Sequence, residues 1–546
     1  MKQLIISTIL FLSGMTTYAA VGDTFTQEGL TYIIKSNNTV GIYSVSNDVT
    51  ECTIASTITY KDITYNVASI ERDAFYWSNV TKVTLPNTIT EIGYGAFRSS
   101  PLESINIPST VKSIGAYAFY KTNIKTIEVP EGITVLENAT FSQCYELESI
   151  KLPSSLEKIS QATFYKSNLA KIEIPAKCTQ IDAYAFEASS NLEEVILPNT
   201  ITELSMGIFK DCTKLSKVNL PEALTSIKTM AFQGCAISSI HFPATVSSIE
   251  ASAFNDVPLS SITLDENNET FTLIDGALYT KDKRFIYLYP RITESKKYDI
   301  IDGCVAVYGG AFYGCDVKTV TFPKNFLGLD AFAFCYSQLE TVNLPNTVEI
   351  IYDQAFAGTK LSHITIPEGV KQLSEAILAD CKNLKTVTLP TRLTDVGNRV
   401  FFQCTALETI NCLGEVPSEF DAWETYTDPF FGVDCSKITV KCPQSALTAY
   451  KISEWGDFFT KIVGTDFSCI LTPESEHITI SIVNNSINIA LIDNSETNIS
   501  IFTAGGNLIF SKSFIGNNTE ITDLPQGVYL ISVSNNKTKT VQKIKL

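Results

Sequence analysis

One phenylalanine that recurs at an almost constant step constrains this chain more than any other feature of its sequence. The step is 22 or 23 residues along nine positions: Phe75, Phe97, Phe119, Phe141, Phe164, Phe186, Phe209, Phe232 and Phe254. A proline keeps the same step, at Pro86, Pro108, Pro130, Pro153, Pro175, Pro198, Pro221 and Pro243. A period of this length is typical of a solenoid, in which each repeat forms one coil and the coils stack into a continuous core.

The residues between two of these phenylalanines predict how one coil is built. In the repeat that ends at Phe119, Ile105 and Ile107 alternate with polar residues, which is the pattern of a short strand with one side inward. Pro108 ends that strand, because proline has no N–H to donate to a neighbour. We therefore expect each strand to pair in parallel with the same strand of the next coil, and the phenylalanine rings of adjacent coils to stack.

The repeat resembles that of a known family. Its pattern, Ile-x-Ile-Pro-x-x-Val-x-x-Ile-Gly-x-x-Ala-Phe-x-x-Cys, is similar to the BspA-like leucine-rich repeats of bacterial surface proteins over most of residues 71–412. The resemblance implies a mainly β protein, a leucine-rich-repeat solenoid of about 22–23 residues per coil with short parallel strands and a cap at each end. It specifies the fold far better than the function, because repeat solenoids host many kinds of partner.

Departures from the period set the expected domain boundaries. The step from Phe254 to Phe312 is 58 residues, which is not a multiple of 22 or 23, and Thr280-Lys-Asp-Lys283 within it predicts a hairpin turn. We interpret this insertion as either an elaborated coil or a functional projection. In chain order the expected parts are a signal peptide (1–20), an N-terminal cap (21–70), the solenoid (71–412) with its hairpin insertion (265–303), a C-terminal cap with a last strand and a short helix (413–464), and a β-sandwich (466–546).

The C-terminal part departs from the repeat altogether. Short alternating segments separated by Asn, Gly and Asp begin after about Asp466, and they predict a small antiparallel β-sandwich. Within it, Leu524-Pro-Gln-Gly527-Val-Tyr resembles the C-terminal sorting domain of the type IX secretion system, although Gly505-Gly506-Asn507 stands where that family usually has Asp-Gly-Arg. The resemblance implies export to the cell surface. The alternative is a generic sandwich that only terminates the protein.

The first twenty residues and the overall charge predict an exported, acidic protein. Lys2 precedes an apolar run from Leu4 to Leu12 and then small residues up to Ala20, as in a secretory signal peptide, and the run is too short to span a membrane. The formal net charge of −17 argues against nucleic acid as a partner. We expect a cell-surface or secreted protein that is associated with the outer membrane and has no membrane span.

Fourteen cysteines in an exported chain raise the question of disulfides. Many of them instead keep one place in the repeat, three residues after the coil-closing side chain: Cys144, Cys212, Cys235, Cys315, Cys381 and Cys404. Equivalent places of successive coils form a column, so we predict a row of small buried thiols. The better disulfide candidates lie near the end of the array: Cys412, Cys435 and Cys442. Because the chain has no Cys-x-x-Cys pair and only three histidines, we expect no metal site and no cofactor.

The sequence contains no arrangement that is typical of an enzyme. A catalytic nucleophile needs a histidine beside it, but His241 and His363 occupy outward strand places that Asn, Glu or Thr hold in other repeats, and His477 lies in a linker. A glycine-rich phosphate loop and a calcium loop are also missing. We therefore predict a protein that is not an enzyme. A carbohydrate-related or proteolytic enzyme is the less favoured alternative.

The outward side chains of the longer strand are the candidate binding residues. Alternation turns them toward solvent, mixed in charge in the first half of the array and rich in threonine in the second. They are Lys151, Lys171, Glu173, Glu194, Lys217, His241, Thr319, Thr321, His363, Thr365, Thr386 and Thr388. Threonine ladders are also ordinary stabilisers of β-sheets. We predict non-catalytic binding or adhesion to a protein or glycan of a host or bacterial surface. The alternative is a structural component of the surface layer.

Overall fold

The computed structural model describes residues 20–36, 38–420 and 427–467 and, from the C-terminal segment, 478–483, 486–491, 496–503, 508–515, 518–522, 524–525, 528–534 and 539–545. The predicted signal peptide up to residue 19, His477 and the turn at Gly505–Asn507 lie outside the described residues. Contacts divide the chain into two units. The first comprises the chain up to Lys318 with 328–338 and 352–357, and the second comprises 319–327, 339–351 and 358–546.

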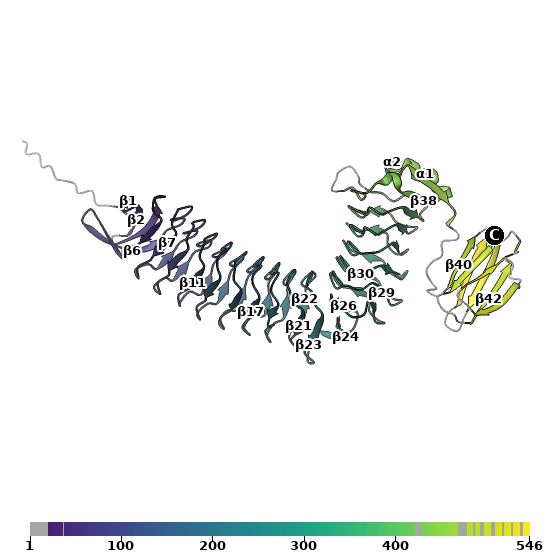
Figure 1. Ribbon diagram of the computed structural model, residues 1–546, viewed down its shortest axis with the longest axis horizontal. Coiled ribbons are helices and arrows are strands. Elements are labelled where there is room, and N and C mark those ends of the chain that lie inside the picture. The colour runs from purple at the N-terminus through teal and green to yellow at the C-terminus, as the bar shows by residue number, and fades with distance from the viewer. Residues whose placement is uncertain are drawn as a thin grey trace, which may run out of the picture. The chain divides into compact units, whose positions relative to one another are not determined.

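The coils of the first unit are built from two short strands each, and the strands form two columns (Figure 1). Pairing within a column is parallel, as predicted. On β15 and β17, for example, Lys171 is in register with Glu194. The longer strands are β4 (Glu51–Thr53), β7 (Lys82–Thr84), β9 (Ser104–Asn106), β11 (Thr126–Glu128), β13 (Ser149–Lys151), β15 (Lys171–Glu173), β17 (Glu194–Ile196), β19 (Lys217–Val218), β21 (Ser239–Phe242) and β23 (Ser261–Leu264). The shorter strands are β8 (Glu91–Ile92), β10 (Ser113–Ile114), β12 (Val135–Leu136), β14 (Lys158–Ile159), β16 (Gln180–Ile181), β18 (Glu203–Leu204), β20 (Ser226–Ile227) and β22 (Ser248–Ile249).

Antiparallel strands precede the first regular coil. β1 (Thr24–Gln27), β2 (Leu30–Ser36) and β3 (Thr39–Val45) form a meander, and β5 (Thr57–Tyr60) pairs antiparallel with β6 (Ile63–Ile70). Both β3 and β8 then pair in parallel with β6, so this sheet passes directly into the column of shorter strands. The meander therefore pairs the backbone N–H and C=O groups that the first coil would otherwise leave open at its edge.

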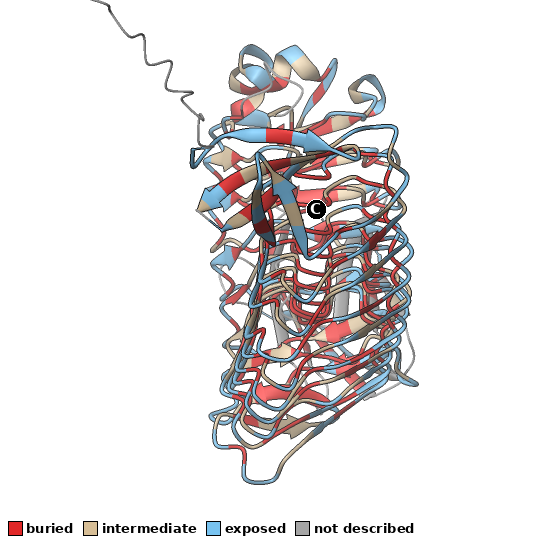
Figure 2. Ribbon diagram, turned by 90° about the vertical axis from the view of Figure 1, so that its left-hand side faces the viewer, coloured by how far each residue is buried: buried red, intermediate tan, exposed pale blue. Residues whose placement is uncertain are grey.

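The repeat phenylalanines stack through the middle of the first unit. Each of the nine rings contacts the next, with centroids 4.8–5.8 Å apart and planes within 24° of parallel. Phe254 is 7% exposed and the other eight are fully buried. Figure 2 shows buried residues on the inside of the coils and exposed residues on the outside. The predicted stacking is confirmed. Since one such ring buries about 150–250 Å², the stack supplies a large part of the core.

The turns on either side of each ring depend on a left-handed backbone. The residues two before and two after each repeat phenylalanine have a positive φ, as at Asp73 (54°) and Trp77 (55°) around Phe75. In this conformation the N–H of Asp73 donates to the Tyr94 carbonyl of the next coil (2.9 Å). The N–H of Trp77 donates likewise to the Arg98 carbonyl (3.2 Å). A non-glycine residue in this conformation costs about 1–2 kcal/mol, and the hydrogen bonds between coils offset that cost.

The predicted column of buried thiols is present. Cys144 Sγ donates to the Phe119 carbonyl of the preceding coil (3.0 Å), and Cys212 makes the same bond to Phe186 (3.0 Å). Burial raises the pKa of the Cys212 thiol to about 12, so the thiol stays protonated and unreactive at neutral pH. The described cysteines are all free thiols, most of them buried. This corrects the expectation of bridges at Cys412, Cys435 and Cys442.

The insertion after Phe254 forms strands that join the core. β24 (Phe271–Ile274), β25 (Ala277–Thr280) and β26 (Phe285–Leu288) pair antiparallel, and the predicted turn that begins at Thr280 connects the last two. β26 then pairs in parallel with β28 (Ala306–Val307), and β28 with β30 (Gly328–Leu329). Tyr279 and Tyr298, the latter in β27 (Lys297–Asp299), are buried with their hydroxyl groups 2.8 Å apart. These contacts favour the elaborated coil over the projection.

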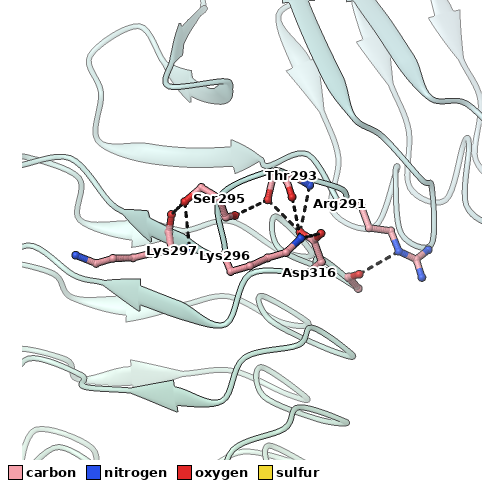
Figure 3. Close-up of polar contacts among 7 residues, drawn as sticks. Arg291, Thr293, Ser295, Lys296, Lys297 and Asp316 are labelled. Carbon is pink, nitrogen blue, oxygen red and sulfur yellow. Dashed lines mark hydrogen bonds and ion pairs between the residues drawn. The ribbon is translucent and has the colours of Figure 1, made fainter.

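Asp316 holds the loop that follows β26 within the insertion (Figure 3). Thr293 donates to Asp316 Oδ1 from its backbone N–H (3.2 Å) and its hydroxyl (3.0 Å), and Lys296 forms an ion pair with Oδ2. At the start of the loop, Arg291 forms an ion pair with Asp256. Burial by itself would raise the pKa of Asp316, but the contacts with Lys296 and Thr293 outweigh it and hold the pKa below its usual value.

The second unit has a similar pair of columns. The longer strands are β29 (Thr319–Thr321), β31 (Thr341–Val342), β33 (His363–Thr365), β35 (Thr386–Leu389) and β37 (Thr409–Cys412), and the shorter are β32 (Ile350–Ile351), β34 (Gln372–Leu373) and β36 (Asp395–Val396). β38 (Thr439–Pro443) and β39 (Lys461–Thr465) extend the sheet of β37 in parallel. The single helix expected between them is two helices, α1 (Leu447–Ile452) and α2 (Glu454–Phe458), because Ser453 is extended. Two short 3-10 turns lie at Cys435–Lys437 and Gln444–Ala446.

The C-terminal strands form two antiparallel sheets with their own core, as predicted for a sandwich. One sheet contains β40 (Ile478–Val483), β41 (Ser486–Leu491) and β44 (Asn518–Ile521). The other contains β42 (Glu496–Thr503), β43 (Leu508–Ile515), β45 (Val528–Ser534) and β46 (Lys539–Lys545). The buried residues of this core are Ile487, Ile489, Ile499, Ile501, Ile521, Tyr529, Ile531 and Val533.

Removing one ring from the middle of the stack should destabilise the first unit. Phe186→Ala leaves a cavity between Phe164 and Phe209, and we expect it to lower the free energy of unfolding by about 3–5 kcal/mol. His241→Ala, at an exposed strand position, should change it by less than about 0.5 kcal/mol. Chemical denaturation of both variants measures this. A loss at His241 equal to that at Phe186 would contradict the assigned orientation of the strands.

Lowering the pH should release the loop that Asp316 holds. Its folded pKa is depressed, so its stabilising contribution is complete above the unfolded pKa of about 3.9 and is lost as the pH falls through the folded pKa. Hydrogen exchange in residues 291–297, corrected for intrinsic rates, should be slow at pH 7 and faster at pH 3. In the Asp316→Asn variant, the N–H groups of residues 291–297 should exchange fast at both pH values. Equal protection of wild type and variant at pH 7 would show that the carboxylate does not hold the loop.

Candidate binding surfaces

The charged residues that were predicted as binding residues share one face of the first unit. Lys171, Glu194 and Lys217 are in register on β15, β17 and β19, and Lys171 Nζ is 3.1 Å from Glu194 Oε2. Lys151 on β13 lies 2.6 Å from Glu128 on β11. Glu194 is half-buried, and the exposed members are Lys151, Lys171, Glu173 and Lys217. The structure therefore brings these side chains together as one solvent-facing column whose charges partly neutralise each other.

The two described histidines occupy similar outward places. His241 of β21 is exposed, with Nδ1 3.0 Å from the Thr263 hydroxyl of the neighbouring strand. His363 of β33 is exposed, with Nδ1 3.1 Å from the Ser362 hydroxyl. In these two contacts each ring meets a hydroxyl group and not the carboxylate that orients a catalytic histidine.

The predicted threonines of the second unit are less accessible than their places in the repeat suggest. Thr388 is only 8% exposed, so the prediction that it faces solvent is wrong. It lies between Thr365 and Asn411 of the flanking strands, and Asn411 Nδ2 donates to its hydroxyl at 3.1 Å. These neighbours cover it. Thr365 is exposed, and the half-buried members are Thr319, Thr321 and Thr386. Part of this threonine field therefore stabilises the sheet.

A groove that the sequence analysis did not anticipate runs beside the shorter strands of the first unit. Its volume is about 1050 Å³, and its lining comes from the coils of β12 to β22. Tyr184 and Met206 form its apolar part, with the Tyr184 hydroxyl 2.9 Å from Met206 Sδ. Its charged lining residues are Glu137, Lys158, Asp182, Glu203, Lys228 and Glu250. The sequence does contain a signal that could have indicated this groove: a polar residue that points outward stands beside the inward Ile or Leu of each shorter strand.

Ion pairs hold three of the four carboxylates of this groove. Lys158 Nζ lies 2.9 Å from Asp182 Oδ2. Lys228 Nζ lies 3.4 Å from Glu203 and 3.1 Å from Glu250. Burial by itself would raise the pKa of Glu250, but hydrogen bonds from Thr229 and from Lys228 outweigh it and lower that pKa. The hydrogen bond to Glu250 in turn raises the pKa of Lys228. Both groups are therefore ionised at neutral pH.

The groove has a net negative charge and many hydrogen-bond acceptors. Four carboxylates face two ammonium groups in its lining, which leaves a charge of −2. The amides of Asn138 and Gln161 and the hydroxyls of Ser160 and Ser205 add further donors and acceptors. Chemically, such a lining can bind ligands that are rich in hydroxyl or amino groups.

Two further properties bear on how the surface is used. Nowhere in the described part of the chain do three or more His, Cys, Asp or Glu side chains gather in a way that could hold a metal ion. The described helices α1 and α2 have six and five residues, and neither could cross a bilayer.

Two protein families match the chain. The family described as BspA type leucine-rich repeat region matches in six copies, over residues 68–193, 179–279 and 306–421. The family described as secretion system C-terminal sorting domain matches residues 473–546. No curated protein matches the chain.

Several solved structures are similar to this chain. A leucine-rich cell surface protein of Faecalibacterium prausnitzii is 24% identical, with a TM-score of 0.44, over 81% of this chain and 95% of that one. The pneumococcal vaccine antigen PcpA is 19% identical, with a TM-score of 0.42, over 82% of this chain and 100% of that one. A leucine-rich repeat protein of Bacteroides ovatus is 23% identical, with a TM-score of 0.40, over 71% of this chain and 94% of that one.

Proposed function

The chain belongs to the BspA-type leucine-rich repeat family, and on this premise we propose that it binds a macromolecule of a host or bacterial surface without catalysing a reaction. The type IX sorting domain that matches its C-terminal part makes it an exported protein of the cell surface. The protein would therefore bind its ligand outside the cell, where proteins and glycans are the available macromolecules.

The length of the groove is the observation that carries the proposal. Its lining comes from six coils, those that contain Glu137, Ser160, Asp182, Ser205, Lys228 and Glu250. Neighbouring strands lie about 4.8 Å apart, so five steps between these coils span roughly 24 Å. A small metabolite would fill only part of that length, whereas an extended chain would contact every coil. The groove therefore suits a polymer that lies along the stack.

The outward column of the longer strands offers a second contact area in the same unit. Lys171, Glu194 and Lys217 alternate in charge along it. Such a pattern contributes to the choice of partner more than to raw affinity, because each charge already has an opposite neighbour. We include the exposed members of this column in the proposed binding surface of the first unit. The exposed residues Thr365 and His363 are a separate candidate area of the second unit, and we leave out the buried Thr388.

A carbohydrate-related or proteolytic enzyme is the rival function from another class. Hydrolysis by two carboxylates needs one acid whose pKa is raised. In the groove, the pKa of Glu250 is lowered instead. In the second unit, burial and then the nearby Glu419 raise the pKa of Asp395. A broad hydrolase screen should therefore include Asp395→Asn. If the wild type hydrolyses a substrate and this variant does not, the enzyme hypothesis would replace the binding proposal.

Binding should depend on the carboxylates of the groove. We expect the full chain to retain at least one glycan or matrix protein on an array, and Asp182→Asn combined with Glu203→Gln to weaken that interaction at least tenfold. Surface plasmon resonance with the retained component measures the change. Glu148→Gln, an exposed glutamate outside the groove, is the matched control and should bind like the wild type.

Two results would reject this proposal. The first is a full chain that retains no component and assembles with itself instead, which would favour a structural part of the surface layer. The second is a retained component whose affinity is the same for the double variant and for Glu148→Gln, which would place the binding surface elsewhere.

Deleting residues 466–546 should abolish surface display but leave the solenoid folded. The C-terminal sheets have a hydrophobic core of their own, so the coils should not need them for stability. We expect the melting temperature of the truncated chain to stay within about 2 °C of the corresponding transition of the full chain. In the native host the truncated chain should remain in the periplasm, as cell fractionation would show. Truncated protein at the cell surface would contradict a sorting role for this domain in the chain.

A further inference from the structure

Aromatic and cationic side chains gather at the closing turns of the first three regular coils. We call the following six residues the aromatic ledge: Tyr76, Trp77, Tyr94, Arg98, Tyr117 and Tyr120. Tyr76 and Trp77 have ring centroids 6.3 Å apart, and the Arg98 guanidinium lies 4.4 Å from the centroid of Tyr76. The centroids of Tyr94 and Tyr117 are 5.4 Å apart, and those of Tyr117 and Tyr120 are 5.8 Å apart. Each side chain thus has at least one aromatic or cationic neighbour in the ledge.

The place of Trp77 in its turn is not explained by folding. It lies two residues after Phe75, in the left-handed conformation that every coil needs there, yet its side chain is 70% exposed. In the next eight coils, the same place is held by small or hydrophilic residues: Ser99, Lys121, Gln143, Lys166, Ala188, Asp211, Gly234 and Asp256. Glycine and asparagine adopt this conformation with less strain than tryptophan. Trp77 meets the ring of Tyr76 but keeps most of its surface in solvent, so packing within the coil offsets little of this strain and the ring stays available to a ligand.

The turns that carry the ledge have more positive than negative charge when the flanking residues are included. Arg72 lies 4.3 Å from the centroid of Tyr94, and Lys121 is exposed one coil further on. Arg72 and Arg98 share Asp73, with nitrogen–oxygen distances of 3.4 and 3.9 Å. Glu71 forms an ion pair with Lys35, outside the ledge. Three cations against one shared carboxylate give an excess of positive charge in a chain whose formal net charge is −17.

We propose that the aromatic ledge binds an acidic polysaccharide, with sugar faces against its rings and the sugar carboxylates near Arg98, Arg72 and Lys121. Aromatic rings of tyrosine and tryptophan present an apolar face together with a polar edge, which matches the C–H face and hydroxyl rim of a pyranose. Guanidinium groups bind carboxylates with two parallel hydrogen bonds. The backbone hydrogen bonds between coils hold the turns of the ledge about 4.8 Å apart, so a polymer that runs along the stack meets the rings and the cations on successive turns.

This inference concerns a surface other than the groove. The ledge residues come from the turns that close on Phe75, Phe97 and Phe119, whereas the groove lining begins at Glu137. The two surfaces also differ in charge, because the groove carries −2. A ligand of the ledge is therefore acidic, and substitutions in the groove should not change its affinity.

Affinity electrophoresis of the full chain tests the proposal. Polygalacturonate and hyaluronan are the acidic probes, and dextran is the neutral one. We expect the acidic polymers to retard the wild type, dextran to have no effect, and rising salt to weaken the retardation. Trp77→Asn should weaken binding at least tenfold, while its melting temperature stays equal to or above that of the wild type because asparagine relieves the strain. Arg98→Gln should weaken binding of the acidic polymers as well.

Tyr336→Asn is the matched control, because Tyr336 is a half-exposed aromatic residue in the same left-handed place of another coil. It should bind the acidic polymers like the wild type. The proposal is overturned if the acidic polymers retard Trp77→Asn and Arg98→Gln as strongly as the wild type. It is also overturned if neither acidic polymer retards the wild type. A protein that crosslinks to the ledge while neither polymer binds would likewise overturn it, in favour of a protein partner.

Discussion

The contact between one coil-closing phenylalanine and the next is the interaction on which the first unit depends. It fixes the spacing of the coils from the inside, and the N–H groups of the left-handed residues beside each ring fix the same spacing from the backbone. Repeats of 22 and 23 residues both fit. The extra residue lies after the ring, where Leu147 and Leu192 follow their phenylalanine by six residues and Ile124 and Leu169 by five. All four are fully buried, so the surface loop takes up the difference.

Interior and exterior of a coil are under different constraints. The inward places are nearly invariant from coil to coil because each must match its two neighbours. For folding, the residues at outward places need only keep the chain soluble and, in the closing turns, adopt the left-handed conformation. The groove and the aromatic ledge both lie on such outward places, on different sets of coils. One scaffold can therefore present an acidic and a cationic surface without any change to its core, as repeat proteins in general do.

The sequence predicted the features that repeat, and it missed those that depend on comparing neighbouring coils. Alternation and the constant step were enough for the strands, the stack of rings and the buried thiols such as Cys144. The burial of Thr388 was missed because alternation gives the direction of a side chain but not the size of its neighbours. The groove was missed because Asp182, Glu203 and Lys228 come from separate repeats and become one surface only when the coils are stacked. The break at Ser453 has no marker such as proline or glycine at that position.

Hydrogen exchange of the full chain, resolved to single residues, tests the account of the coil most directly. If the closing turns join the coils, the N–H groups two residues before and two residues after each repeat phenylalanine from Phe75 to Phe209, and that of Gly234, should exchange slowly. Protection should recur with the step of 22 or 23 residues between Asp73 and Gly234, and it should be as strong in the turns as in the strands. Fast exchange at Asp73, Trp77 and their counterparts, with protection confined to the short strands, would contradict the account.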